Sequence, residues 1–164
     1  MIIRRAAVAD YDALWPLLQG VFRAGDTYAV DPQISKADAL AYWVTQAAAT
    51  YVADGPDGIV GTYYIKTNQP GGGAHICNCG YILAPSARGQ GVARELCKHS
   101  QNAARDLGYR AMQFNFVLAS NVGAVRLWQQ LDFMTLGTIP DAFNHPTAGL
   151  VDAHIMYKSL VTSD

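Results

Sequence analysis

The sequence has little charge of either sign and few cysteines. Only 15% of the 164 residues are charged, and the formal net charge is -1. Proteins that bind nucleic acid usually carry a strongly basic surface, so no nucleic-acid partner is expected. Apolar runs end well before the roughly 18 residues that span a bilayer, so no membrane partner is expected. The first residues lack the charged-then-apolar order of a signal peptide, which predicts a cytoplasmic protein.

The cysteines do not form a disulfide framework. They are only three, Cys77, Cys79 and Cys97, and an odd number without a secretory signal argues against paired cysteines. Cys77 and Cys79 would share one face of a strand, as half of a metal site or as two small core residues. Because no second Cys/His pair stands at zinc-like spacing, the core role is favoured and no metal is predicted.

Hydrophobic residues make up 51% of the chain, which is enough for the core of one domain spanning residues 1–164. Apolar periodicity and turn residues predict alternating short strands and longer helices. We expect strands at 2–6, 51–53, 59–66, 74–83, 111–117, 133–139 and 151–157, and helices at 9–23, from 35 to about 47, 91–107 and 121–131. This order predicts an α/β fold with a mixed, partly parallel and partly antiparallel twisted sheet flanked by helices.

Some local features carry their own expectations. Asp10 is expected to cap the first helix, and Pro16 to distort it. The segment 25–32 shows no clear period and is expected to be a loop. Loops at 25–34 and 140–150 would close a pocket around a small ligand.

One stretch predicts an anion site, because a strand runs through Tyr81 and Leu83 into a glycine-containing loop and then a helix. The loop and first helical turn comprise Arg88, Gly89, Gln90, Gly91, Val92 and Ala93. Unpaired N–H groups and the helix dipole favour an anion at a helix start, and glycines let a phosphate approach. An ordinary glycine turn is the alternative. A nucleoside triphosphate loop would end in Gly-Lys-Ser/Thr, and a dinucleotide loop would need a small residue at Arg94.

The stretch 83–93 resembles motif A of the GCN5-related N-acetyltransferases (GNAT), whose signature is Arg/Gln-x-x-Gly-x-Gly/Ala. A second match downstream consists of Asn121, Ala124, Leu127, Trp128 and Phe133, and the resemblance covers essentially the whole chain. It implies an enzyme, an acyltransferase of the N-acetyltransferase class, with acetyl-CoA as co-substrate. It also implies a splay between the fourth and fifth strands, with the pantetheine arm between them.

The resemblance assigns further roles. The pantetheine arm would pair with backbone near Tyr81 and Leu83, and the Leu83 N–H would face the thioester oxygen. Asn121 would contact pantetheine, cap its helix, or do both. The family's frequent acidic tyrosine falls on Trp128, which would be a channel wall or a core residue, and the usual glycine falls on Asp132. Because a thiol titrates near roughly 8.5, its thiolate is a tolerable leaving group near neutral pH even without an acid to protonate it.

A weaker resemblance, in 74–81, 113–117 and 121–128, points to the branch with fungal acetyltransferases of proline-like amino acids. It implies a small-molecule amine as acceptor, such as an amino acid or a proline analogue. A protein or peptide amine and a non-catalytic acyl-CoA-binding domain stay open as alternatives. So do a homodimer and a longer acyl donor.

Candidate acceptor residues lie on the two splayed strands. The family's usual glutamate base is absent, and Cys77 stands near its position. His75 is a candidate base, with a structural histidine and ordered water as alternatives. Asn78 and Asn115 would orient the acceptor through their amides, or else satisfy backbone groups where the strands separate.

Overall fold

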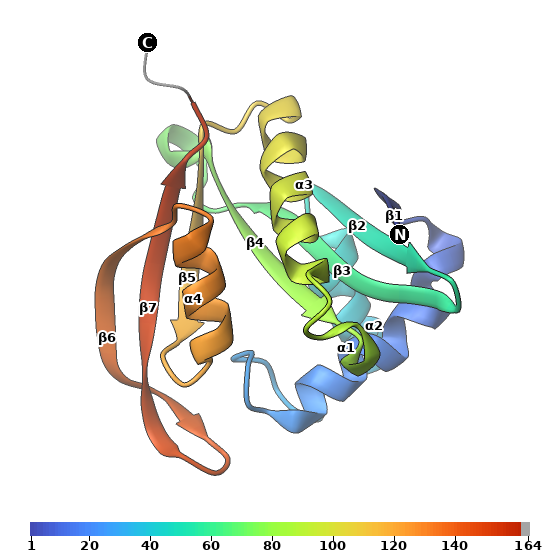
Figure 1. Ribbon diagram of the computed structural model, residues 1–164, viewed down its shortest axis with the longest axis horizontal. Coiled ribbons are helices and arrows are strands. Elements are labelled where there is room, and N and C mark those ends of the chain that lie inside the picture. The colour runs from blue at the N-terminus through green and yellow to red at the C-terminus, as the bar shows by residue number, and fades with distance from the viewer. Residues whose placement is uncertain (162–164) are drawn as a thin grey trace.

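The computed structural model describes residues 1–161 and holds seven strands in one twisted sheet (Figure 1). The strand order is β1-β2-β3-β4-β5-β7-β6. The strands are β1 (Ile2–Arg5), β2 (Ala49–Gly55), β3 (Gly58–Thr67), β4 (Ile76–Leu83), β5 (Ala111–Leu118), β6 (Met134–His145) and β7 (Gly149–Ser159). The β4–β5 pair is parallel and the other pairs are antiparallel, so the predicted mixed sheet is confirmed.

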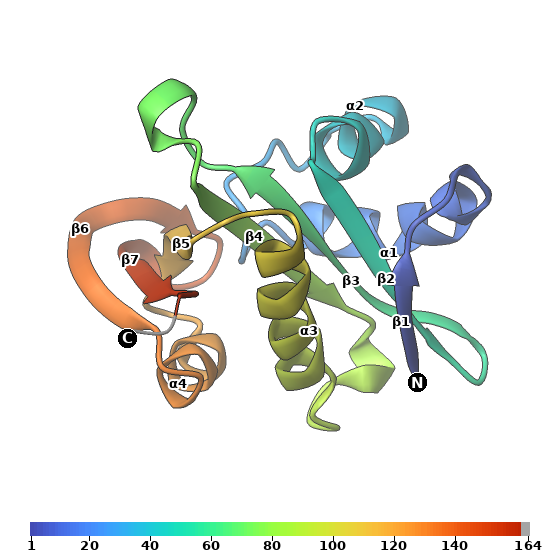
Figure 2. The ribbon, with the colours of Figure 1, turned by 90° about the horizontal axis from the view of Figure 1, so that it is seen from above.

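Helices cover both faces of the sheet, as Figure 2 shows. One face carries α1 (Tyr11–Ala24) and α2 (Lys36–Leu40), and the other carries α3 (Val92–Asp106) and α4 (Val122–Gln130). Successive strand residues point to opposite faces, so Tyr63 packs in the α3 core and Tyr64 in the α1–α2 core. Among residues 1–161 there is no helix with the length and apolar character needed to cross a membrane.

The predicted order of strands and helices is confirmed, but local details differ. α1 follows a short 3-10 turn and runs through Pro16 without a break. Asp10 does not cap α1 with its side chain. Its carboxylate instead accepts from the Ala7 N–H at 2.7 Å and from the Arg4 guanidinium at 2.8 Å, which ties β1 to the start of the helix. Ser35 caps α2 by accepting from the Asp38 N–H, and the helix continues as a π-helical turn over Ala41–Thr45.

Two strand boundaries bear on the site. Residues 74 and 75 belong to a turn, and β4 begins at Ile76. The expected loop at 140–150 is wrong, because β6 and β7 extend through most of it as a hairpin. Pro140 does not end β6, since that strand lies at the sheet edge, where proline is tolerated.

The predicted splay between the fourth and fifth strands is confirmed. β4 and β5 pair through Ile76–Ala111 and Cys77–Met112 alone in residues 1–161, and then separate. The Ala84 N–H donates to Val60 in β3 at 2.9 Å, so even-numbered residues at this end of β4 bond β3. Because backbone direction alternates along a strand, the N–H and C=O groups of Cys79, Tyr81 and Leu83 point into the gap.

Candidate active site

The loop before α3 has the geometry of an anion site. Gly89 and Gly91 adopt left-handed backbone angles, with φ of 73° and 78°. A Cβ at either position would meet no atom within 4 Å. The backbone conformation therefore favours glycine at both positions, and the space in front of the loop is open. Gly91 caps α3 without a side-chain hydrogen bond, which leaves the first-turn N–H groups, those of Val92 and Ala93 included, free for a ligand.

A cavity of about 540 Å³, here called the loop cavity, opens beside this turn. Its lining includes Arg88, Gly89 and Ala93 from the loop and helix start, and Tyr81, Leu83 and Trp128 from β4 and α4. Arg88 is exposed and forms no salt bridge within residues 1–161. The Gln90 side chain does not line this cavity, and its amide donates to the Ser86 carbonyl at 2.7 Å. That bond holds the loop in shape.

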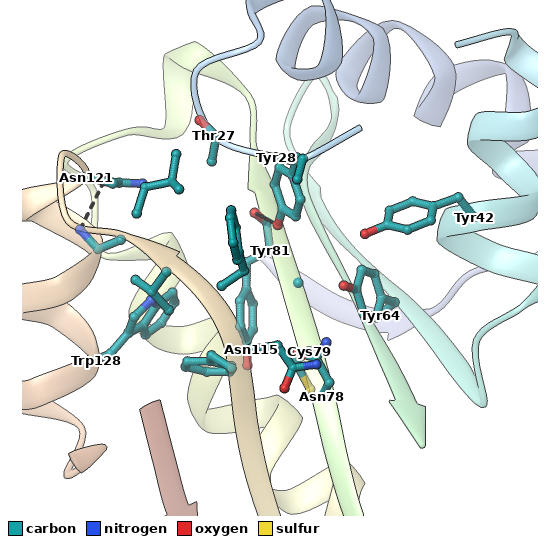
Figure 3. Close-up of a pocket in the computed structure, with 17 residues that line it drawn as sticks. Thr27, Tyr28, Tyr42, Tyr64, Asn78, Cys79, Tyr81, Asn115, Asn121 and Trp128 are labelled. Atoms are coloured by element: carbon teal, nitrogen blue, oxygen red, sulfur yellow. Dashed lines mark hydrogen bonds between the residues drawn. The ribbon is translucent and has the colours of Figure 1, made fainter. Parts of the chain in front are cut away.

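A second cavity of about 310 Å³, here called the tyrosine cavity, lies where β4 and β5 separate (Figure 3). Tyr28, Tyr42 and Tyr64 gather on its α1–α2 side, and Trp128 stands across β4 from them. The two cavities share six lining residues: Thr27, Tyr28, Tyr81, Asn121, Ala124 and Trp128. The cavities therefore adjoin at the splay.

Tyr28 connects the α1–α2 loop to the splayed strand. Its hydroxyl donates to the Tyr81 carbonyl at 2.9 Å, and its ring packs edge-on against Trp43 with centroids 5.7 Å apart. Burial raises its pKa well above the ordinary value, so the phenol stays protonated. Gly80 makes this approach possible, because a Cβ there would lie 2.6 Å from the Tyr64 ring and 3.0 Å from the Tyr28 hydroxyl.

Asn78 and Asn115 both line the tyrosine cavity but differ in their contacts. The Asn115 amide donates to Asn68 at 2.7 Å and accepts from Gln113 at 3.0 Å. It lies in a bulge of β5, where two residues oppose one of β7. Asn78, which is only partly buried, makes no side-chain hydrogen bond to any residue of 1–161. Of the pair, Asn78 is the amide free to meet a ligand.

Trp128 and Asn121 lie at the junction of the cavities. Trp128 is 7% exposed, and its ring packs 5.0 Å from Tyr81 and 5.1 Å from Phe114, centroid to centroid. It is both a cavity wall and a core residue. Asn121 caps α4, with its side-chain oxygen accepting from the Ala124 N–H at 3.2 Å. Asp132, at the family's glycine position, has a φ of 66°, and that left-handed turn is one that aspartate tolerates better than most residues.

The structure does not bring His75 to these cavities. His75 is exposed in the turn before β4 and lines neither of them. Within residues 1–161, no carboxylate or imidazole lines the tyrosine cavity. Cys79 does line it, but burial raises the pKa of its thiol well above the ordinary value. Cys77, Cys79 and Cys97 are free and buried, as expected of core residues.

Sequence reasoning missed the aromatic residues of the tyrosine cavity. Tyr28 comes from a loop, Tyr42 from the turn after α2, and Tyr64 from β3. In the sequence these three tyrosines stand next to turns or at the centre of an apolar strand. Ordinary core tyrosines occupy the same kinds of position, so the pattern does not single out a binding site.

Comparisons with known proteins point to the same family as the sequence resemblance. The family model described as the acetyltransferase (GNAT) family matches residues 11–133. The chain is 40% identical to a GCN5-related N-acetyltransferase from Kribbella flavida, whose structure matches over 96% of each chain with a TM-score of 0.91. It is also 39% identical to N-acetyltransferase aca1 of Schizosaccharomyces pombe over 108 residues. This matched segment covers 65% of this chain and 52% of that protein. The matched segment thus spans about half of that relative's length.

The fold is shared more widely. A phosphinothricin acetyltransferase (Pat) from Sinorhizobium meliloti, solved in complex with acetyl-CoA, matches 96% of this chain and 87% of its own with a TM-score of 0.84 at 18% identity. The family model matches well over half of the sequence, and a 40% identical relative matches nearly all of it. The chain therefore belongs to the acetyltransferase (GNAT) family.

Proposed function

We propose that this chain is an acetyl-CoA-dependent N-acetyltransferase whose acceptor is the amine of a small molecule. The observation that carries the proposal is the pair of adjoining cavities. One has an open glycine loop at a helix start, which suits a pyrophosphate. The other is about 310 Å³, at the lower end of the range for small-molecule sites.

The donor would lie along the open edge of β4. Its pyrophosphate would accept from the N–H groups of Gly91, Val92 and Ala93, with Arg88 as an added cation. Its pantetheine amides would pair with backbone groups of Tyr81 and Leu83 that point into the gap. This arrangement would set the thioester at the junction of the two cavities, where Trp128 lines both.

The reaction would be a direct transfer in a ternary complex. The neutral amine attacks the thioester carbon, a C–N bond forms, and the C–S bond breaks as the thiolate leaves. The Leu83 N–H would stabilise the negative charge that develops on the carbonyl oxygen, a role that contributes roughly 2.7–4 kcal/mol in other enzymes. A buried thiol that stays protonated is a poor nucleophile, so Cys79 does not favour an acyl-cysteine route.

The proton lost by the amine goes to water in this proposal. No carboxylate or imidazole from residues 1–161 lines the tyrosine cavity, and Asp26 and His145 line only the loop cavity. Within the tyrosine cavity the acceptor would therefore arrive neutral or lose its proton through ordered water. His75 is not assigned this role. Asn78 would orient the acceptor with its free amide, and Asn115 would shape the cavity wall.

A thiol-release assay with acetyl-CoA over a panel of small amines, amino acids and short peptides tests the proposal. Release with small amines and none with peptides is the expected result. Tight acetyl-CoA binding by calorimetry without release from any amine would instead identify a non-catalytic acyl-CoA-binding domain. Release with peptides alone would identify a protein or peptide acetyltransferase.

A further inference from the structure

Lys66 is a partly buried cation without an acidic partner. It lies near the end of β3, and its Nζ stands 3.8 Å from the centroid of the Tyr42 ring and 4.5 Å from that of Tyr64. No carboxylate within residues 1–161 forms an ion pair with it. Its pKa is lowered to about 8, and loss of hydration through burial is the cause. The ammonium is therefore held by aromatic faces alone.

This cation lies at the rim of the tyrosine cavity. Lys66 pairs across the sheet with Asn78, and Tyr64 precedes it by two positions on the same face of β3. Asn78, Tyr64 and Tyr42 all line the cavity, although Lys66 itself stands just outside the lining. Of the lining residues that the structure describes, none carries a formal charge. The Lys66 ammonium is thus the charged group that a ligand in the tyrosine cavity would meet at the Asn78 end.

We propose that Lys66 binds the carboxylate of the acceptor, so that the acceptors of this chain are amines that carry a carboxylate, such as amino and imino acids. This inference rests on the proposed function. The tyrosine rings would hold the ammonium at the rim, and the free Asn78 amide, directly across the strand pair, would donate a second hydrogen bond to the same carboxylate.

The spacing of the strand residues limits the size of such an acceptor. Asn78 marks the level of Lys66 on β4, and Tyr81, which lines both cavities at the junction proposed for the thioester, stands three residues further on. At a rise of about 3.3 Å per residue these levels are roughly 10 Å apart. The carboxylate and the reacting amine would have to fit within that length, as they do in a single amino acid.

Lys66→Met tests the inference, because it keeps most of the aliphatic stem and removes the charge. The matched control is Lys98→Met, an exposed lysine of α3 that pairs with Glu95 and lines neither cavity. Each variant would be assayed with acetyl-CoA and paired amines that differ by one carboxylate: L-proline with pyrrolidine, and L-alanine with ethylamine. Melting temperature and acetyl-CoA affinity would be measured on the same samples.

In Lys66→Met we expect a loss of at least tenfold in kcat/KM for the carboxylate-bearing member of each pair. The carboxylate-free member should change less than threefold, and acetyl-CoA affinity should not change. Lys66→Arg should recover part of the loss, and Lys98→Met should behave as wild type. An equal loss for both members, or no loss for either, would overturn the inference while the proposed function stands.

A binding experiment separates the two proposals if wild type acetylates none of these amines. That outcome would count against the proposed function. N-acetyl-L-proline would then be titrated into wild type and Lys66→Met by calorimetry. Binding that weakens in the variant would support a carboxylate site at Lys66. Equal binding, or no binding to wild type, would overturn it.

Discussion

Gly91→Asp should abolish tight donor binding without unfolding the protein. Gly91 caps α3 at a φ of 78° and has open space around the position of a Cβ. A non-glycine residue in this region costs roughly 1–2 kcal/mol of strain, although aspartate is among the residues that tolerate it best. Set against that cost, a carboxylate at a helix start gains about 0.3–1 kcal/mol from the dipole. The net loss of stability should therefore be near 1 kcal/mol.

The effect on the donor should be larger, because two losses act together. The new carboxylate would compete for the first-turn N–H groups, an interaction worth about 1 kcal/mol at helix caps. It would also place a negative charge against the pyrophosphate. Together these should weaken acetyl-CoA binding by at least tenfold, or about 1.4 kcal/mol.

Gly108→Asp is the matched control for this prediction. Gly108 also has a left-handed φ, of 88°, and open space around the position of its Cβ, but it lies beyond the other end of α3 and lines neither cavity. Calorimetry with acetyl-CoA and a thermal melt on both variants would decide. A folded Gly91→Asp protein with wild-type donor affinity, or an equal loss in both variants, would refute the argument.

Four further outcomes follow from the site. Asn78→Ala should leave the melting temperature and donor affinity near wild type, because its side chain bonds no described residue, and should lower acceptor efficiency several-fold to a hundredfold; destabilisation with a uniform loss would contradict this. Trp128→Phe should lower stability by about 1–2 kcal/mol and turnover by less than tenfold; a thousandfold loss in a folded, donor-binding variant would make the indole essential. Tyr28→Phe removes the bond to the Tyr81 carbonyl and should cost about 1 kcal/mol of stability without weakening donor binding, measured by melting and calorimetry. With a carboxylate-bearing amine, kcat/KM should rise with pH as the amine deprotonates and level off above about pH 8, where Lys66 loses its charge; with a carboxylate-free amine it should continue to rise above about pH 8.

The donor side of the site could be predicted from the sequence because its requirements are local. A left-handed backbone at Gly89 and Gly91 favours glycine, and the loop, helix start and strand end are contiguous in the chain. The splay itself came from the resemblance of these residues to a family, since no local pattern reports how two strands separate. Asn121 was likewise readable as a helix cap because capping depends on neighbouring residues.

The acceptor side could not be predicted in the same way, because distant segments build it. Tyr28, Tyr42 and Tyr64 meet only when the α1–α2 loop folds over the sheet. From the sequence alone, Lys66 looks like an ordinary exposed residue at the end of a strand. Its place beside the cavity follows only from its pairing with Asn78 in the sheet. The expectation for His75 depended on a strand that begins two residues earlier than the observed Ile76. The expected loop at 140–150 failed because Pro140 lies in an edge strand.

The parting of β4 and β5 also has a consequence for folding stability. A sheet gains from every backbone pair it closes, and here an interior pair of strands is joined through only two register positions. On the proposed mode of binding, the donor arm takes the place of a missing strand segment. Backbone groups of β4 that face the gap would then gain hydrogen-bond partners from the co-substrate. A ligand at a hundred times its Kd stabilises the folded state by about 2.7 kcal/mol. The melting temperature should thus report acetyl-CoA concentration, and a cell depleted of donor would hold a less stable protein.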